Sequence, residues 1–182
     1  NPSVLSQLLR FLADKVTTPV SANKIATDLK IDDKTAKFYL EYLQSIYLIY
    51  PIYRYGRSYR ISKNSVPKYY FNDIGVLNLY SIRPRRGHIV ENAVFIELLR
   101  RNSFKENPDI YYEVINSQEI DFYSQNELYE VKSALEDPDS QLGKYNLTDE
   151  KIKIVLDKDF KEVKKLPYFP NLEYMELSKF LT

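Results

Sequence analysis

The sequence has no cysteine, no tryptophan, a single histidine and four glycines among 182 residues. The absence of cysteine excludes a disulfide framework and any thiolate metal site. Because His88 is the only histidine, a metal centre built on imidazoles is excluded too, and we interpret His88 as a bystander near a helix start. None of the glycines precedes Lys-Ser or Lys-Thr, so the glycine loop that cradles nucleotide phosphates in ATPases is missing.

Long apolar runs are missing as well. No stretch approaches the length that spans a bilayer, and no signal peptide is visible, so we expect a cytoplasmic protein without a membrane partner. The net charge is only +1, so any affinity for nucleic acid must come from local basic patches. The length allows one large or two small domains, each able to bury a core.

Two neighbouring segments in the second half alternate apolar and charged residues, as strands do. They cover residues 119–122 and 129–132, and the polar residues between them suit a tight hairpin turn. A turn centred on Gln125 and Asn126 would place Asp121 opposite Glu130. The two segments therefore predict a hairpin that brings two carboxylates together on one face.

Opposed carboxylates on a sheet repel each other, and a bound divalent cation would remove that repulsion. Lys132 lies on the same predicted face as Glu130 and could stabilise an attacking water or a developing phosphate charge. The pattern therefore indicates a Mg²⁺ site at Asp121 and Glu130. The alternative is a solvated hairpin face that binds nothing.

Three further residues extend this candidate site. Glu91 lies in a strongly apolar helical segment, where a carboxylate is costly unless something pairs with it. Gln141 and Tyr145 are one helical turn apart, so they share a face and could reach a phosphate or a metal-bound water. The alternative for all three is an ordinary position on a helix surface.

The N-terminal third has a different pattern. Apolar spacing predicts helices over residues 4–16, 21–29 and 34–46, with Asp32 or Asp33 opening the third. Residues 47–53 are rich in β-formers, and after a turn at Gly56 residues 58–61 could return as a strand. Three helices followed by a β-hairpin resemble the winged helix-turn-helix.

That resemblance implies a third helix in the major groove and a wing on the DNA backbone. Arginine interleaved with tyrosine in residues 54–63 suits phosphate contact and stacking. The candidate nucleic-acid contacts are Lys34, Lys37, Arg54, Arg57, Arg60, Lys63, Arg85 and Arg86. The acidic start of the third helix favours the alternative, in which this unit docks a protein.

The C-terminal half resembles the PD-(D/E)XK nuclease superfamily, whose core is a helix, three strands, a helix and a further strand. The family pattern of a helix Glu, a strand Asp, Glu-x-Lys and Gln-x-x-x-Tyr is matched in order by Glu91, Asp121, Glu130, Lys132, Gln141 and Tyr145. The resemblance implies Mg²⁺ bound by Asp121, Glu130 and Glu91, with the other three acting on water and phosphate. Many members of this superfamily have lost catalysis, so the fold does not fix the activity.

The whole chain resembles the C-terminal region of a family of prokaryotic and archaeal AAA-type ATPases. Its segments at residues 67–75, 87–95, 119–122 and 129–132 carry the resemblance. The resemblance implies that this chain is a fragment and that its own N-terminal ATPase domain, which would be the part that binds ATP, is a partner. It also implies duplex DNA as a partner and a possible homo-oligomer.

We therefore expect an α+β chain in three parts. Residues 1–66 form a winged helix-turn-helix, residues 67–84 a connecting strand and helix, and residues 85–182 a restriction-endonuclease-like αβββαβ domain. The expected function is an ATPase accessory region that binds DNA and cuts phosphodiester bonds with Mg²⁺. The alternative is a catalytically inactive module that binds DNA or protein and regulates the ATPase.

Overall fold

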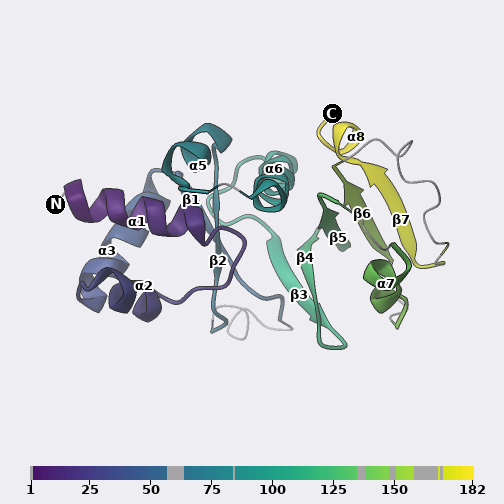
Figure 1. Cartoon of the computed structure of the whole chain (residues 1–182), viewed down its shortest axis with the longest axis horizontal. Helices are drawn as coiled ribbons and strands as arrows, with labels where there is room; N and C mark the ends of the chain where they lie inside the picture. Colours follow the sequence, from purple (N-terminus) through teal and green to yellow (C-terminus); the bar gives the residue numbers. More distant parts are fainter. Residues whose placement is uncertain are drawn as a thin grey trace. The chain divides into compact units, whose positions relative to one another are not determined.

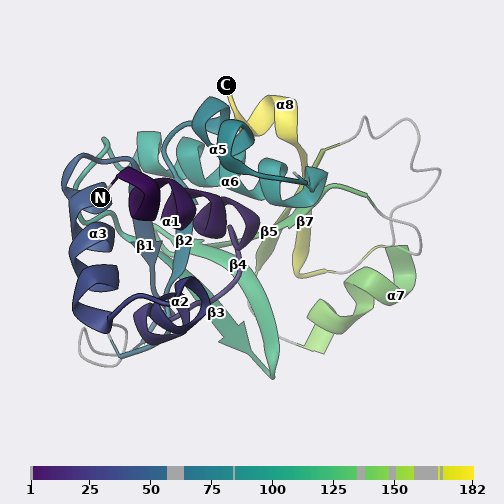
Figure 2. The same cartoon turned by 60° about the vertical axis from the view of Figure 1, so that its left-hand side comes forward.

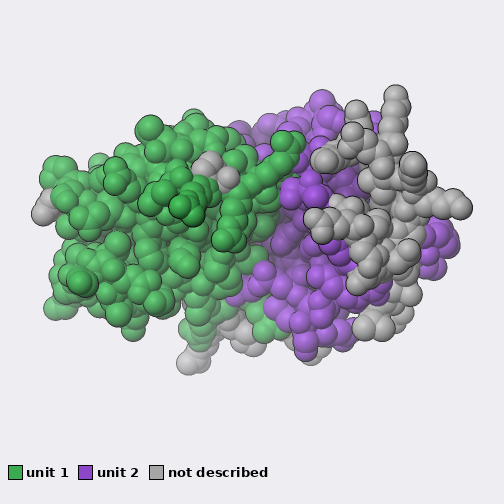
Figure 3. All heavy atoms as spheres, viewed as in Figure 1, with its two compact units in different colours: residues 1–92 green, residues 93–182 purple. Residues whose placement is uncertain are grey.

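The computed structural model describes residues 2–56, 64–83, 85–134, 138–147, 151–157, 168 and 170–182. The chain combines helices and sheets, so the expected α+β class is confirmed at that level. It divides into two compact units, residues 1–92 and residues 93–182 (Figure 3). The boundary falls inside a helix, and residues 67–84 are grouped with the first unit.

The first unit opens with three helices, and polar side chains cap two of them. The elements are α1 (Pro2–Asp14), α2 (Ala22–Leu29), α3 (Asp33–Ser45), β1 (Ile49–Ile52), β2 (Lys68–Phe71), α5 (Ile74–Tyr80) and the start of α6 (Arg86–Arg101) (Figure 1). Ser21 accepts from the Lys24 amide and Asp32 from the Thr35 amide, which satisfies donors that a helix start leaves open. Asp32 is thereby a cap of the third helix, as its sequence position indicated.

The sheet of the first unit has two described strands. β1 lies beside β2 (Figure 2) and pairs with it antiparallel, from Ile49 opposite Phe71 to Ile52 opposite Lys68. Pro19 adds an isolated bridge to Lys68. The strand expected over residues 58–61 lies outside the described residues. β2, which we expected only as a connection, therefore supplies the described partner of β1.

Buried side chains of the helices and of β2 form the core of the first unit. Leu8 and Leu12 of α1, Ile25 of α2 and Leu43 of α3 are at most 1% exposed, as is Tyr70 of β2. The apolar positions of α1 and α3 recur every three to four residues, so one stripe of each helix is buried. This periodicity is why the three helices could be predicted from the sequence.

The second unit is built on a mixed five-stranded sheet. Its elements are the end of α6, β3 (Ile110–Ile115), β4 (Gln118–Ser124), β5 (Glu127–Lys132), α7 (Pro138–Gly143), the 3₁₀ helix η1 (Lys144–Leu147), β6 (Ile152–Leu156), β7 (Leu172–Glu176) and α8 (Leu177–Phe180). The strands lie in chain order, with β3, β4 and β5 antiparallel and β6 and β7 running parallel to β5. Because β6 runs parallel to β5, the chain between them must cross back along the sheet, and α7 and η1 lie in this crossover.

Both hairpins of this sheet close through two-residue turns. Asn116 and Ser117 link β3 to β4, and Gln125 and Asn126 link β4 to β5; all four have positive φ. Turns with two residues of positive φ match the twist of paired strands. The predicted turn at Gln125 and Asn126 is thus confirmed.

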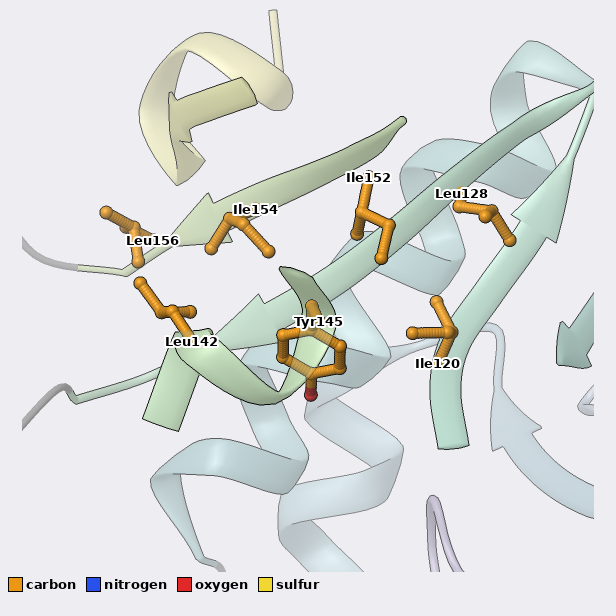
Figure 4. Packing of buried hydrophobic residues seen from close by; sticks show 7 residues of the cluster. All are labelled: Ile120, Leu128, Leu142, Tyr145, Ile152, Ile154 and Leu156. Atoms are coloured by element: carbon orange, nitrogen blue, oxygen red, sulfur yellow. The ribbon is translucent and has the colours of Figure 1, made fainter. Parts of the chain in front are cut away.

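An apolar cluster fills the space between the sheet and the crossover (Figure 4). It consists of Ile120, Leu128, Leu142, Tyr145, Ile152, Ile154 and Leu156. In Figure 4 the ring of Tyr145 lies among these residues while its hydroxyl points away from the other six. Packing of the ring therefore fixes where that hydroxyl is presented.

Among the described residues, no helix is long and apolar enough to cross a bilayer.

Candidate carboxylate–lysine site

Glu130 is the centre of the candidate site. It lies on β5 and is only 3% exposed. Its Oε1 accepts a hydrogen bond from the Tyr145 hydroxyl at 2.6 Å and a charged hydrogen bond from Lys132 Nζ. Lys132 Nζ also lies 3.4 Å from the Tyr145 hydroxyl oxygen. A buried carboxylate needs such partners, so these three side chains form one polar unit.

Asp121 reaches this unit from β4. The regular pairing of β4 with β5 runs from Ser124 to Phe122, and at Asp121 a side chain replaces the backbone ladder. The Val131 amide donates to Asp121 Oδ2 at 2.9 Å, and the Asp121 amide lies 3.3 Å from Glu130 Oε2. The two carboxylates predicted to lie together are therefore neighbours, where the strands begin to part.

The pKa of the Tyr145 phenol reflects the electrostatic environment of the site. Burial raises the pKa of its phenol far above the ordinary value, and the negative charge of Glu130, the hydrogen bond to it and the charges of Asp121 and Glu119 add to the shift. The phenol therefore stays protonated and acts as a donor. The same charges show that the site is acidic despite the presence of Lys132.

Gln141 contributes a side-chain oxygen that could accept a hydrogen bond from a bound water or ligand. It lies on α7, one turn before Tyr145, and is partly buried. Among the described residues, its buried Oε1 has no hydrogen-bond partner. A buried acceptor left open costs about 1–3 kcal/mol, so this atom is suited to a water or a ligand donor.

The structure gives Glu91 partners inside the first unit. The Tyr70 hydroxyl donates to its Oε1 at 2.7 Å, and Lys68 Nζ lies 3.8 Å from the same oxygen. Lys68 is 1% exposed, so it needs an anion as much as Glu91 needs a cation. These contacts explain a carboxylate in an apolar helix without a metal.

The candidate nucleic-acid residues are distributed over the first unit. Lys34 and Lys37 are exposed on α3, where Lys37 pairs with Asp33 one turn earlier. Arg54 follows β1, and its amide donates to Ser65 Oγ at 2.8 Å. Arg85 and Arg86 are exposed at the start of α6. The other three, Arg57, Arg60 and Lys63, lie outside the described residues.

An exposed apolar stripe on α3 was not anticipated from the sequence. Phe38, Tyr42 and Ile46 are 62%, 46% and 49% exposed and follow one another at intervals of four residues. Helical periodicity could have predicted this stripe, because a helix that buries Ala36, Leu40 and Leu43 leaves these three residues on its outer face. A stripe of this kind favours an apolar partner over a DNA groove.

The donor set can be tested against Mg²⁺. Within the part of the chain that the structure describes, no group of three or more His, Cys, Asp or Glu residues could hold a metal ion. Asp121 and Glu130 supply two carboxylates, and Mg²⁺ is commonly bound by one or two carboxylates together with waters and substrate phosphates. The residues therefore fit a cation shared with a phosphate, and they do not fit a closed protein cage.

Comparison with known proteins matches residues 1–85 to the family model described as "Domain of unknown function (DUF8612)". Uncharacterized protein MJ1544 of Methanocaldococcus jannaschii is 34% identical over 128 residues, which are 67% of this chain and 28% of that protein. An uncharacterized protein of Haemophilus influenzae is 31% identical over 150 residues, which are 75% of this chain and 35% of that protein. The chain thus spans about a third of these relatives. No solved structure matches significantly.

Proposed function

We propose that the second unit is a PD-(D/E)XK-like module that cuts phosphodiester bonds with Mg²⁺. The observation that carries this is the meeting of Asp121, Glu130, Lys132 and Tyr145 at the point where β4 and β5 part. Two carboxylates, a lysine and a phenol in contact supply what such a reaction requires: metal ligands, a cation and a fixed donor.

The sheet order supports the same proposal. A helix, the antiparallel strands β3, β4 and β5, the crossover α7 and the parallel strand β6 follow one another in the order of that superfamily's core. The crossover also carries Tyr145 to Glu130. A surface hairpin that binds nothing would not need the crossover to cover its charged residues.

Each side chain has a role in this proposal. Asp121 and Glu130 hold the cation, which would supply Lewis-acid stabilisation of the phosphate when bound. Tyr145 orients the Glu130 carboxylate through its 2.6 Å hydrogen bond. Lys132 faces the developing negative charge, and Gln141 Oε1 offers an acceptor for a water proton.

Without a cation, Lys132 neutralises Glu130. A divalent ion on Glu130 would compete with Lys132 for the same carboxylate, which would release the ammonium group toward the phosphate. The lysine thus has two arrangements, one that stabilises the fold and one that serves the reaction.

The first unit is proposed to bring this module to duplex DNA as a winged helix, beside an AAA-type ATPase domain. The order of three helices and a β-sheet supports the first part, as do the basic residues Lys34, Arg54, Arg85 and Arg86. The second part is supported by the length of the relatives, of which the chain spans 28% and 35%.

A plasmid-nicking assay with Mg²⁺ or Mn²⁺, run beside thermal melting, tests the proposal. The wild type should nick DNA and melt at a higher temperature with Mn²⁺, because a ligand of the folded state stabilises it by mass action. Asp121→Asn should lose both effects, whereas Lys132→Met should lose only the nicking. Glu173→Gln, a matched change at an exposed position of β7, should retain both.

If Mn²⁺ shifts no melting curve and the wild type does not nick, the catalytic proposal is rejected. The second candidate function is then protein docking through α3, which the exposed stripe of Phe38, Tyr42 and Ile46 favours. Its partner would be the proposed AAA-type ATPase domain. In that case Tyr42→Ala should abolish capture of such a domain supplied in trans and leave the affinity for duplex DNA unchanged.

A further inference from the structure

The first unit contains a pocket that is distinct from the carboxylate–lysine site. It lies between the end of α1, the end of α5 and the start of α6, and holds about 270 Å³ including the open space at its mouth. Its apolar lining includes Leu77 and Ile89. Its polar lining comes from Asp14, Ser81, Arg83, Arg85 and His88.

The charges of this lining are unbalanced. Arg83 and Arg85 are exposed, and within the described residues neither guanidinium group makes a hydrogen bond or an ion pair. Asp14 is the one acid among the described lining residues, and its Oδ1 already accepts from Ser81 Oγ at 3.2 Å and from the Ile82 amide at 3.0 Å. The described lining therefore carries two guanidinium groups against one carboxylate, so positive charge is in excess.

His88 senses the resulting positive potential. Burial lowers the pKa of its imidazole, and the charges of Arg85 and Lys68 lower it further. Lys68 has Glu91 as its partner, whereas Arg85 has none among the described residues. An anion in the pocket would offset these charges and favour a proton on His88.

We propose that this pocket binds a single phosphoryl group, held by Arg83 and Arg85 with His88 as a further donor. Guanidinium groups match phosphate oxygens with forked hydrogen bonds, and both arginines line the same pocket. The phosphoryl group belongs to free phosphate or to a nucleic-acid backbone; the second source rests on the proposed DNA binding, whereas the pocket itself does not.

The single histidine makes the test direct. The Cε1–H resonance of His88 is the only one of its kind in the chain, so it needs no assignment. Inorganic phosphate titrated at fixed pH and fixed ionic strength should move it, with saturation, toward its protonated position. Arg85→Gln should weaken this binding about tenfold. Arg10→Gln, at an exposed position of α1 outside the pocket, should leave it unchanged.

A short DNA duplex in a second titration identifies the source. If the duplex moves the same resonance and phosphate competes with it, the ligand is the backbone; if only phosphate moves it, the ligand is free phosphate and DNA is excluded from this pocket. A shift no larger than that caused by chloride, or one that Arg85→Gln leaves intact, would overturn the proposal. Asp121→Asn should not alter the response, so failure of the nuclease proposal remains distinguishable.

Discussion

Glu130 is a carboxylate that the fold buries and then compensates. Its side-chain donors come from different elements, Lys132 from the same strand and Tyr145 from the crossover, and the Asp121 amide adds a longer bond of 3.3 Å. Removal of one donor from such a unit leaves a charge that water cannot reach. The site is therefore coupled to stability, and its residues can be examined without any knowledge of the substrate.

Lys132→Met should lower the free energy of unfolding without metal by about 2 kcal/mol, because the buried Glu130 carboxylate loses its charged donor. Mn²⁺ should recover part of this loss, since a cation on Glu130 then has no competitor. Urea denaturation with and without Mn²⁺ measures both effects. Lys153→Met is the matched control, because Glu127, its partner, is half-exposed and such pairs contribute about 0–1 kcal/mol. Equal losses in the two variants would contradict the argument.

Glu97 provides a pH-dependent contribution. Its hydrogen bonds with Arg100 and with Arg101 hold its pKa below the ordinary value of 4.5. A lowered pKa means that the stabilisation is complete above pH 4.5 and disappears as the pH falls through the lower value of the folded state. Melting temperatures of the wild type and Glu97→Gln should therefore differ most near neutral pH and converge in acid. A constant difference would show that the charge is not the cause.

Asp121, Glu130 and Lys132 could be singled out from the sequence because strand alternation places charged residues on one face. The partners of Glu91 could not, since Tyr70 and Lys68 are about 20 residues away and pairing at that separation leaves no periodic signal. The ion pair of Lys132 with Glu130 could not be predicted either, for a different reason. Alternation shows that the two share a face, but not that they neutralise each other.

At the scale of elements, the β3–β4 turn is nearly ideal. Its residues are Asn116 and Ser117, both with positive φ, and Asn-Gly is the preferred pair for such a turn. Ser117→Gly should raise the free energy of unfolding by about 0.5–1 kcal/mol, because a side chain at positive φ carries strain that glycine lacks. Ser117→Ala removes the same hydroxyl but retains the strain, so it should give no gain in the same denaturation series.

Asn92 joins α6 to β2. Its amide accepts from the Phe71 amide and donates to the Phe71 carbonyl, both at 2.8 Å, and all these groups are buried. Asn92→Ala should lower the free energy of unfolding by about 2–4 kcal/mol, because two hydrogen bonds are lost and the Phe71 amide and carbonyl are left without these partners. Asn23→Ala, at an exposed position of α2, should cost far less in the same calorimetric comparison. A loss below 1 kcal/mol would mean that water replaces the side chain.

Helices and local hairpins were predictable because their signals lie within a few residues. The turn at Gln125 and Asn126 and the helices of the first unit are examples. The pairing of β1 with β2 was missed because the intervening chain shows no pattern that marks its partner. Sequence periodicity likewise does not reveal that β6 and β7 run parallel to β5, since that depends on a crossover.

At the scale of the whole molecule, no sequence feature supports nucleotide hydrolysis. The glycine loop that cradles ATP phosphates is absent from these 182 residues. Isothermal titration with Mg-ATP should therefore show no micromolar binding, and no phosphate should be released. Weak binding that Arg85→Gln removes would report the phosphoryl pocket, whereas tight binding that survives this change would reveal a site not described above.

The passage of α6 through the boundary at residue 92 bears on how this region can be inherited. Modules that recombine freely are joined by loops, where a break harms neither side. Here a recombination break at the boundary would split one helix, leaving residues 86–92 in one product and residues 93–101 in the other. Exchanges that keep Arg86–Arg101 whole would preserve the helix, so the helix and the units it joins should be transmitted together as a single cassette.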